Sequence, residues 1–252
     1  MTRGLDPTVR RRHSGIDWLG DIPEHWVAPH LRYLVRCLDG TRIPMNAVQR
    51  GALQGDVPYW GANTVIDHVS NWLFDEHLVL LGEDGAPFFE PGRDVAFFVS
   101  GKIWVNNHAH VLRCGSRLLP RYLVHVLNCV DYIGFVDGST RDKLTQQGMG
   151  SIPIQLPPVA EQAAIVSYID EQTSVLTCAA TTADRQIELL REYRTRLIAD
   201  VVTGKLDVLE AASQLPDQVG EPELLDDSDA LEEGDESEDE MDLDGAAGEV
   251  EA

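Results

Sequence analysis

Two polar segments combine the residue types that read nucleic acid. One is Asn106–His110, and the other is the Gly-Ser-Thr-Arg-Asp-Lys-Leu-Thr run at positions 138–145. Arg and Lys side chains bind guanine edges or phosphates, Asn and Gln bind adenine edges, and Ser and Thr bind phosphates. These segments are therefore candidates for contacts to nucleic acid, although exposed polar loops are common. The candidate residues are Arg93, Lys102, Asn106, Asn107, His108, His110, Ser139, Thr140, Arg141, Lys143 and Gln146.

Catalytic and metal-binding patterns are weaker. Ser139 and Lys143 have the spacing SxxxK rather than the SxxK of acyl-transfer enzymes, and neither a nucleophile elbow nor a glycine-rich phosphate loop occurs. Glu83 and Asp84 lie between two glycines, where a hairpin turn is favoured over a carboxylate pair. His108 and His110 would share one face of a strand without an evident third ligand, which favours a structural pair over a metal site. We expect no catalytic residue, metal or cofactor in this chain.

The elements around these segments are predicted to be β-rich. Short bursts of Val, Ile, Phe and Trp alternate with turn signals, and they predict strands at 78–81, 95–99, 103–105 and 109–112. A helix is predicted over 119–133, with Pro120 at its start, and a shorter one over 142–149. The predicted fold class is α+β.

The stretch from 159 to 202 contains neither Pro nor Gly and predicts one long helix of about 65 Å. Pro158 suits its beginning, and Gly204 suits its end. Nine of eleven positions at alternating spacings of three and four are apolar, a pattern typical of a helix that packs on another helix. A single helix lying on its own domain is the alternative. The nine positions, here called the seam, are Val166, Ile169, Leu176, Ala180, Ala183, Ile187, Leu190, Leu197 and Val201.

The net charge of −22 comes mostly from the C-terminal end. From Asp207 onward there are 19 acidic residues and no Lys or Arg, so the rest is nearly neutral, with 20 basic and 23 acidic residues. We expect residues 207–252 to be a disordered tail, either a solubilising one or a mimic of DNA. The absence of a basic excess argues against nucleic-acid binding.

The four cysteines form no CxxC pair, and no 18-residue apolar run or signal peptide occurs. We expect a cytoplasmic protein with reduced thiols and no membrane contact.

Several motifs together resemble one half of the specificity subunit of type I restriction–modification systems. The likeness covers about residues 16–208. It rests on Trp18-Leu19-Gly20-Asp21-Ile22-Pro23-Glu24-His25-Trp26, Tyr59-Trp60-Gly61-Ala62-Asn63, residues 80–86, residues 104–112, residues 138–145, Ile152-Pro153-Ile154, Leu156-Pro157-Pro158 through Glu161-Gln162, residues 189–194 and Thr203-Gly204-Lys205.

The resemblance implies a non-catalytic subunit that reads double-stranded DNA. It implies a flexible N-terminus at 1–15, a target-recognition domain at 16–156, a spacer and dimerisation helix at 157–206 and the tail at 207–252. Methyltransferase and restriction/translocase subunits would be the partners, and S-adenosylmethionine and ATP with Mg²⁺ would bind to them rather than to this chain. The family's usual chain has two recognition domains and two helices.

Because only one of each occurs here, the resemblance implies a half-subunit that self-associates on a bipartite target, or a degenerate or split copy. A scaffold that no longer reads DNA and interacts through its acidic tail is the alternative.

Overall fold

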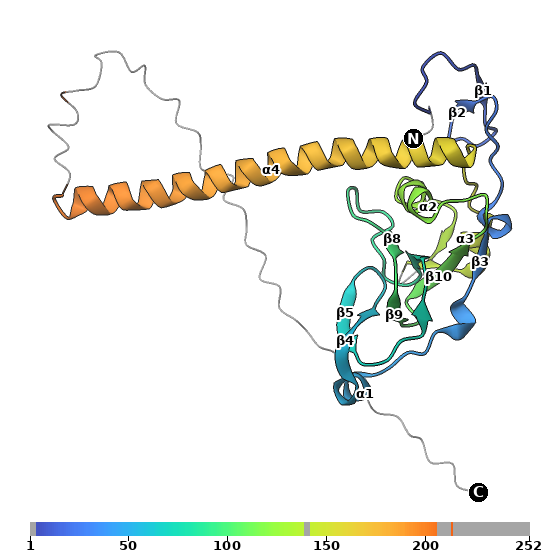
Figure 1. Cartoon of the computed structure of the whole chain (residues 1–252), viewed down its shortest axis with the longest axis horizontal. Helices are drawn as coiled ribbons and strands as arrows, with labels where there is room; N and C mark the ends of the chain where they lie inside the picture. Colours follow the sequence, from blue (N-terminus) through green and yellow to red (C-terminus); the bar gives the residue numbers. More distant parts are fainter. Residues whose placement is uncertain (1–3, 139–141, 206–212, 214–252) are drawn as a thin grey trace, which may run out of the picture. The chain divides into compact units, whose positions relative to one another are not determined.

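The computed structural model describes residues 4–138, 142–205 and 213, and the chain divides into two units, residues 1–184 and 185–252. The predicted tail and the candidates Ser139, Thr140 and Arg141 lie outside the described residues, Ser213 excepted. Within the described ranges, no helix has the length and apolar character needed to span a membrane. Figure 1 traces the elements along the chain.

The first unit mixes short strands with helices. In chain order the elements are β1 (Arg11–His13), β2 (Asp21–Pro23), η1 (Leu31–Tyr33), β3 (Val35–Cys37), η2 (Asp39–Thr41), α1 (Ala47–Ala52), β4 (Gln54–Trp60), β5 (Val65–Val69), β6 (Phe74–Asp75), β7 (Leu78–Gly82), β8 (Ala96–Val99), β9 (Lys102–Val105), β10 (Ala109–Cys114), α2 (Pro120–Leu127), β11 (Val136–Asp137), β12 (Lys143–Leu144), α3 (Gln146–Ser151) and α4 (Val159–Val202). The α+β fold class is confirmed.

The central sheet has the strand order β3-β10-β7-β8, and all of its pairs are antiparallel. Every residue of β7 is buried because apolar clusters cover both faces of the sheet. Val79 and Leu81 pack in the larger cluster with α2 and the beginning of α4, whereas Leu78 and Leu80 pack in a second cluster with β9. This alternation follows from the two-residue period of a strand.

A second sheet has the order β5-β4-β9-β6, in which β4 and β9 run parallel. The sequence did not indicate the β4–β5 hairpin, which contains Pro58 and two irregularities in register. A proline removes a ladder donor, and an irregular register breaks the alternation that identifies a strand. The hairpin β1–β2 also differs from expectation, because Arg11–His13 were assigned to a flexible N-terminus.

The helices follow the predictions in part. α4 has the predicted bounds, but α2 ends at Leu127 rather than at residue 133. Asn128 ends α2, and its side chain binds the backbone of β8, where its Oδ1 accepts from the N–H groups of Val95 and Ala96. The short helix predicted over 142–149 is instead strand β12 followed by α3.

The beginning of α4 packs on the first unit through a buried amide. The Gln162 side chain is completely buried, donates to the carbonyls of Arg117 and Pro157, and accepts from the N–H of Leu119. Glu161, in the first turn, binds the Trp26 indole at 3.1 Å. A carboxylate there also interacts favourably with the helix dipole.

The second unit contains the last part of α4, and all its described side chains up to residue 205 are at least partly exposed. The pairs Arg185–Glu188 and Arg196–Glu192 lie at spacings of three and four on the helix surface. Such pairs stabilise a solvated helix by about 0.2–0.5 kcal/mol each.

Candidate nucleic-acid interface

Three segments that are distant in the sequence meet at His110. They are the turn after β7, the turn between β9 and β10, and the segment from β12 into α3. The backbone N–H of Glu83 binds the carbonyl of His108, and the N–H of Leu144 binds the carbonyl of Glu83, both at 2.8 Å. The first polar motif and the described end of the second, residues 142–145, therefore lie side by side.

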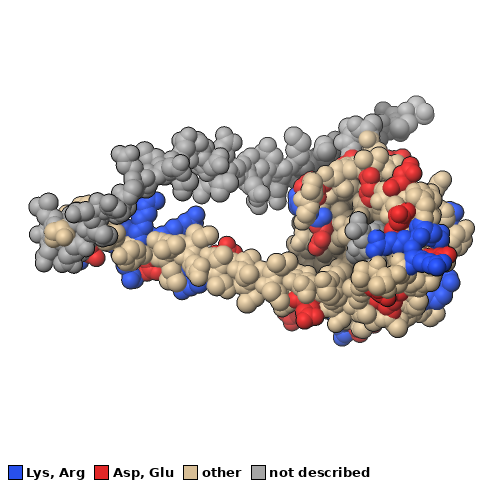
Figure 2. All heavy atoms as spheres, turned by 90° about the horizontal axis from the view of Figure 1, so that it is seen from above, with Lys and Arg blue, Asp and Glu red and all other residues tan. Residues whose placement is uncertain are grey.

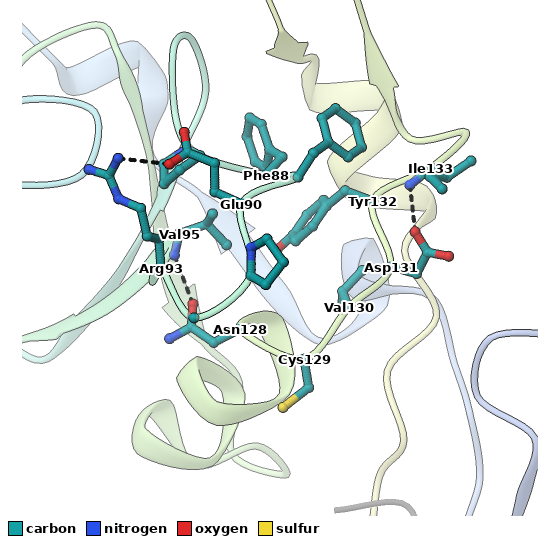
Figure 3. A pocket seen from close by; sticks show the side chains of 14 residues that line it. Phe88, Glu90, Arg93, Val95, Asn128, Cys129, Val130, Asp131, Tyr132 and Ile133 are labelled. Atoms are coloured by element: carbon teal, nitrogen blue, oxygen red, sulfur yellow. Dashed lines mark hydrogen bonds and ion pairs between the residues drawn. The ribbon is translucent and has the colours of Figure 1, made fainter. Parts of the chain in front are cut away.

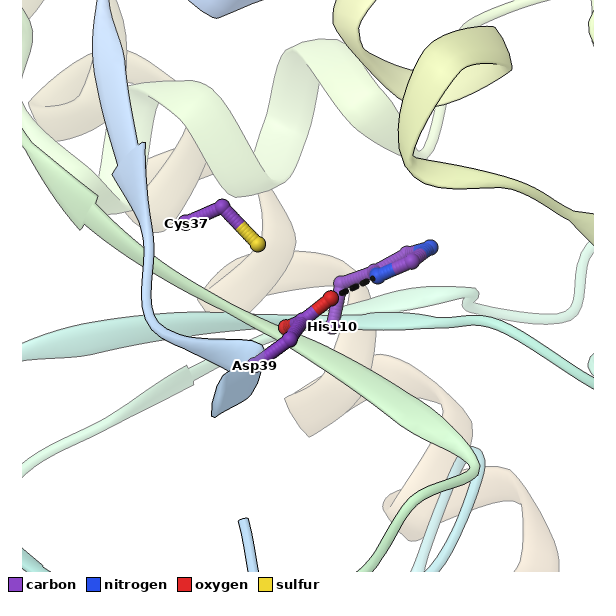
Figure 4. A group of neighbouring side chains, drawn as sticks. All are labelled: Cys37, Asp39 and His110. Atoms are coloured by element: carbon purple, nitrogen blue, oxygen red, sulfur yellow. Dashed lines mark hydrogen bonds and ion pairs between the residues drawn. The ribbon is translucent and has the colours of Figure 1, made fainter. Parts of the chain in front are cut away.

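His110 connects these segments from inside. It is the second residue of β10 and has no exposed surface. Its Nδ1 lies 2.6 Å from Oδ2 of Asp39, and its Nε2 lies 2.7 Å from the carbonyl oxygen of Leu144. Figure 4 shows the imidazole pointing toward the Asp39 carboxylate.

Both oxygens of the Asp39 carboxylate take part in hydrogen bonds. Its Oδ1 accepts from the N–H of Val111, and its Oδ2 also accepts from the side-chain amide of Gln146, both at 2.9 Å. Burial alone would raise the pKa of Asp39. The hydrogen bond and charge of His110 and the N–H of Val111 outweigh burial and hold the pKa well below its ordinary value of 3.8.

Arg42, which is only partly exposed, adds a cation beside Asp39. Its guanidinium donates to Glu83 at 2.6 Å and to the carbonyls of Ala109 at 2.6 Å and Asn107 at 3.4 Å, and it lies 3.5 Å from Asp39. Glu83 also lies 3.7 Å from Nδ1 of His110. We call Asp39, Arg42, Glu83 and His110 the inner network.

An outer rim of polar side chains covers the inner network: Asn107, His108, Lys143 and Gln146. Asn107, Lys143 and Gln146 are exposed, and His108 is partly exposed. Nζ of Lys143 lies 3.5 Å from Glu83, and Nδ1 of His108 lies 3.5 Å from Asp84 without the alignment of a hydrogen bond. The rim presents donors and acceptors to solvent on a rigid base, which is what base and phosphate contacts need.

Two of the candidate DNA-contact residues, His110 and Asn106, are buried rather than exposed. His110 is buried and bonded on both nitrogens, so it cannot touch a DNA molecule directly. Asn106 is also buried, and its Oδ1 accepts from the N–H of His108 at 2.7 Å, which shapes the turn. The prediction that the two histidines are structural rather than metal ligands agrees with the position of His110. His108 lies in the turn before β10, so the two do not share a strand as expected.

Arg93 and Lys102 bind elsewhere. Arg93 forms an exposed ion pair with Glu90 at 2.8 Å, on the rim of a pocket of about 430 Å³ lined by Phe88 and Tyr132 (Figure 3). Nζ of Lys102 lies 3.7 Å from the ring centroid of Trp72, a cation–π contact. No hydrogen bond or ion pair among the described residues joins either side chain to the rim.

Neither Asp39 nor Arg42 is indicated by any pattern in the sequence. Asp39 lies 71 residues before His110, in a short Leu-Asp-Gly-Thr-Arg stretch that reads as an ordinary turn. Glu83 was noticed, but as part of a turn. Only the pairing of β3 with β10 brings Asp39 to His110.

Cys37, Asp39 and His110 also have the composition of a metal site, with ligand atoms within 4.8 Å of one another. The acceptor positions are already used, however. Both nitrogens of His110 and both oxygens of Asp39 bind protein groups, and burial raises the pKa of the Cys37 thiol to about 11, so it is not a thiolate. These residues do not fit a metal ion.

The surface charge of the described part is mixed. Figure 2 shows Lys and Arg gathered in one place on the visible face of the first unit, with acidic side chains around them. On this face the neighbouring carboxylates reduce the attraction that the gathered cations would have for phosphates.

Residues 39–189 match the profile of the type I restriction modification DNA specificity domain. This match covers more than half of the chain, from the inner network into α4. The chain belongs to the type I specificity family. It is also 35% identical over 138 residues to a Haemophilus influenzae protein named as a type I restriction enzyme specificity subunit; these residues are 55% of this chain and 35% of the relative. The matched segment thus covers only about a third of that relative's length.

One solved structure supports the fold of this family member. A chain from a study of complex assembly and conformational transition in a type I restriction–modification system superposes with a TM-score of 0.54 at 18% identity, over 72% of this chain and 46% of the other. A specificity subunit from M. genitalium gives a TM-score of 0.48 at 12% identity, over 61% of this chain and 41% of that one.

Proposed function

We propose that this chain reads DNA sequence as the non-catalytic specificity subunit of a type I restriction–modification complex. The observation that carries the proposal is the family match over residues 39–189, which includes the inner network, the whole outer rim and most of α4. Double-stranded DNA is the ligand. Modification and restriction subunits are the partners, and they bind S-adenosylmethionine and ATP with Mg²⁺.

The outer rim supplies the chemistry of readout. The amide of Asn107 can bind an adenine edge, and Lys143 can bind a guanine edge or a phosphate. Both are exposed, while the backbone beneath them is held by Arg42 and Glu83. Rigid positioning of exposed donors is the arrangement that discriminates between bases.

The exposed seam of α4 suits a second helix. Leu176 and Leu190 are 70% and 66% exposed, and Ile187, Leu197 and Val201 are also exposed. An apolar stripe in water favours association, so we propose that two copies pair through α4 and present two recognition domains. Val166 and Ile169 differ from the other seam positions, because they pack against the core of the first unit.

Two identical domains related by a two-fold axis would read an interrupted palindrome. The length of α4 would then set the spacing between the half-sites.

A gel-shift titration with the purified modification subunit tests the proposal. The complex should bind a duplex with the target more tightly than a duplex of scrambled sequence. Asn107→Ala should relax preference at one position per half-site, at a cost of about 1–3 kcal/mol, whereas Lys143→Ala should reduce the salt slope by about one if it contacts phosphate. Arg121→Ala, which removes an exposed ion pair with Asp170 and is not among the candidates, is the control. Equal binding of both duplexes by the wild-type complex would contradict the proposal.

A further inference from the structure

The hydrogen bonds of His110 determine its charge. A carbonyl oxygen can only accept, so Nε2 carries the proton that binds Leu144 at 2.7 Å. Asp39 accepts hydrogen bonds from Val111 and Gln146 on its two oxygens, as an ionised carboxylate does. The carboxylate therefore accepts from Nδ1 as well. With a proton on each nitrogen, His110 is an imidazolium cation without contact to solvent.

The groups around His110 offset this charge. Asp39 and Cys37 face it from the β3–η2 segment, and Glu83 faces it from the end of β7 at 3.7 Å. Arg42 lies on the far side of the two carboxylates and binds both. Within the inner network the two cations and the two carboxylates thus balance, and pairing of this kind is the condition under which charges with little exposure are tolerated.

The Leu144 carbonyl is a critical point of attachment. Leu144 ends β12, and Thr145 is the N-cap of α3, with Oγ1 accepting from the N–H of Gly148. One residue on each side of this short stretch belongs to the outer rim, Lys143 before it and Gln146 after it. The His110 ring binds the backbone between Lys143 and Gln146 directly, at the carbonyl of Leu144. It is also connected to the side-chain amide of Gln146, because both bind the Asp39 carboxylate.

We propose that His110, as a buried imidazolium, is a positioning residue for sequence readout, fixing Lys143 and Gln146 relative to Asn107 and His108 without touching DNA itself. This inference rests on the proposed function. Loss of one of its two hydrogen bonds releases the β12–α3 segment, so the side chains of the outer rim no longer hold fixed positions relative to one another. Discrimination between sequences then suffers more than affinity for DNA in general, because non-specific affinity comes from phosphate charge.

The test measures the affinity of the full chain with its modification subunit for two duplexes. One contains the sequence at which the host genome is methylated, and the other contains a scrambled sequence. His110→Gln keeps one donor and loses the second bond and the charge. The matched control is Asn128→Ala, which also removes tertiary hydrogen bonds from the first unit but contacts neither turn of the rim. We expect His110→Gln to lower the ratio of the two affinities by about tenfold and to change scrambled-duplex binding less than about twofold. Asn128→Ala should keep the ratio.

A folded His110→Gln protein that discriminates like the wild type, or an Asn128→Ala protein that loses as much discrimination, would overturn the inference. A wild-type complex that does not discriminate would refute the proposed function instead. If His110→Gln does not fold, ¹⁵N-histidine NMR of the wild type decides. Both ring nitrogens of His110 should carry slowly exchanging protons at neutral pH, and a nitrogen with a lone pair would overturn the inference.

Discussion

At the residue scale, the charge on Asp39 is the centre of the inner network. Its carboxylate is almost completely buried and accepts from His110, Val111 and Gln146. Removing one partner of a buried charge pair leaves the other uncompensated, at a cost of about 3–5 kcal/mol. We therefore expect Asp39→Asn to lower the free energy of unfolding by about that amount at pH 7, measured by urea denaturation.

The pH dependence of this effect has a definite sign. Because the pKa of Asp39 is lower in the folded protein than its ordinary 3.8, its contribution is complete above about pH 4 and is lost as pH falls toward the folded-state value. The deficit of Asp39→Asn should thus shrink below pH 4. Glu76→Gln, which breaks the partly exposed pair with Arg113, is the control and should cost less than about 1 kcal/mol. A deficit that does not change with pH would contradict this assignment.

The cysteines should differ in reactivity. Burial raises the pKa of Cys114 to about 12 and that of Cys37 to about 11, whereas Cys129 and Cys178 are exposed. Since the thiolate is the nucleophile, we expect a thiol reagent at pH 8 to label two cysteines rapidly and two slowly in the native protein. Mass spectrometry identifies the sites. Rapid labelling of Cys114 would show that β10 is not packed as described.

The sequence revealed the outer rim but not what holds it. Asn107 and Lys143 stand out because polar residues cluster around them. Asp39 and Arg42 do not, because their partners are far away along the chain and a buried charge has no local signature. The role of His110 could not be predicted from the sequence for the same reason. Its residue type predicts a contact with DNA, whereas its complete burial indicates that it supports the outer rim from inside.

At the element scale, most elements with strong local signals agree with the predictions, whereas the short helix predicted over 142–149 does not. α4 has the predicted bounds because an apolar period, a starting proline and a terminating glycine are all local. β7, β9 and β10 match their apolar bursts to within two residues at either end. α2 ends earlier than predicted because Asn128 binds a strand more than 30 residues away, a tertiary contact that overrides helix propensity.

The exposed seam leads to a prediction about association. Leu190→Glu with Leu197→Glu would place charges between paired helices, so we expect analytical ultracentrifugation to find dimers for the wild type and monomers for the double variant. Thr195→Glu with Ala199→Glu, off the seam on the same helix, should leave the dimer intact. Monomers for every variant, with and without the modification subunit, would rule out pairing through α4.

At the scale of the whole molecule, the acidic end should be dispensable for folding. From Asp207 onward the composition offers many like charges and few large apolar side chains, so it has little surface to bury. A chain truncated after Val208 should melt within about 2 °C of the full chain by circular dichroism. A decrease of several degrees would mean that the acidic end packs on the folded part.

Methylome sequencing tests the central claim most directly. A host that expresses this chain together with its modification subunit should carry adenine or cytosine methylation at one interrupted palindrome, and the mark should disappear when this chain alone is deleted. A bipartite motif with unrelated halves would refute pairing of identical chains while leaving sequence recognition in place. Methylation that does not depend on this chain would contradict the account as a whole.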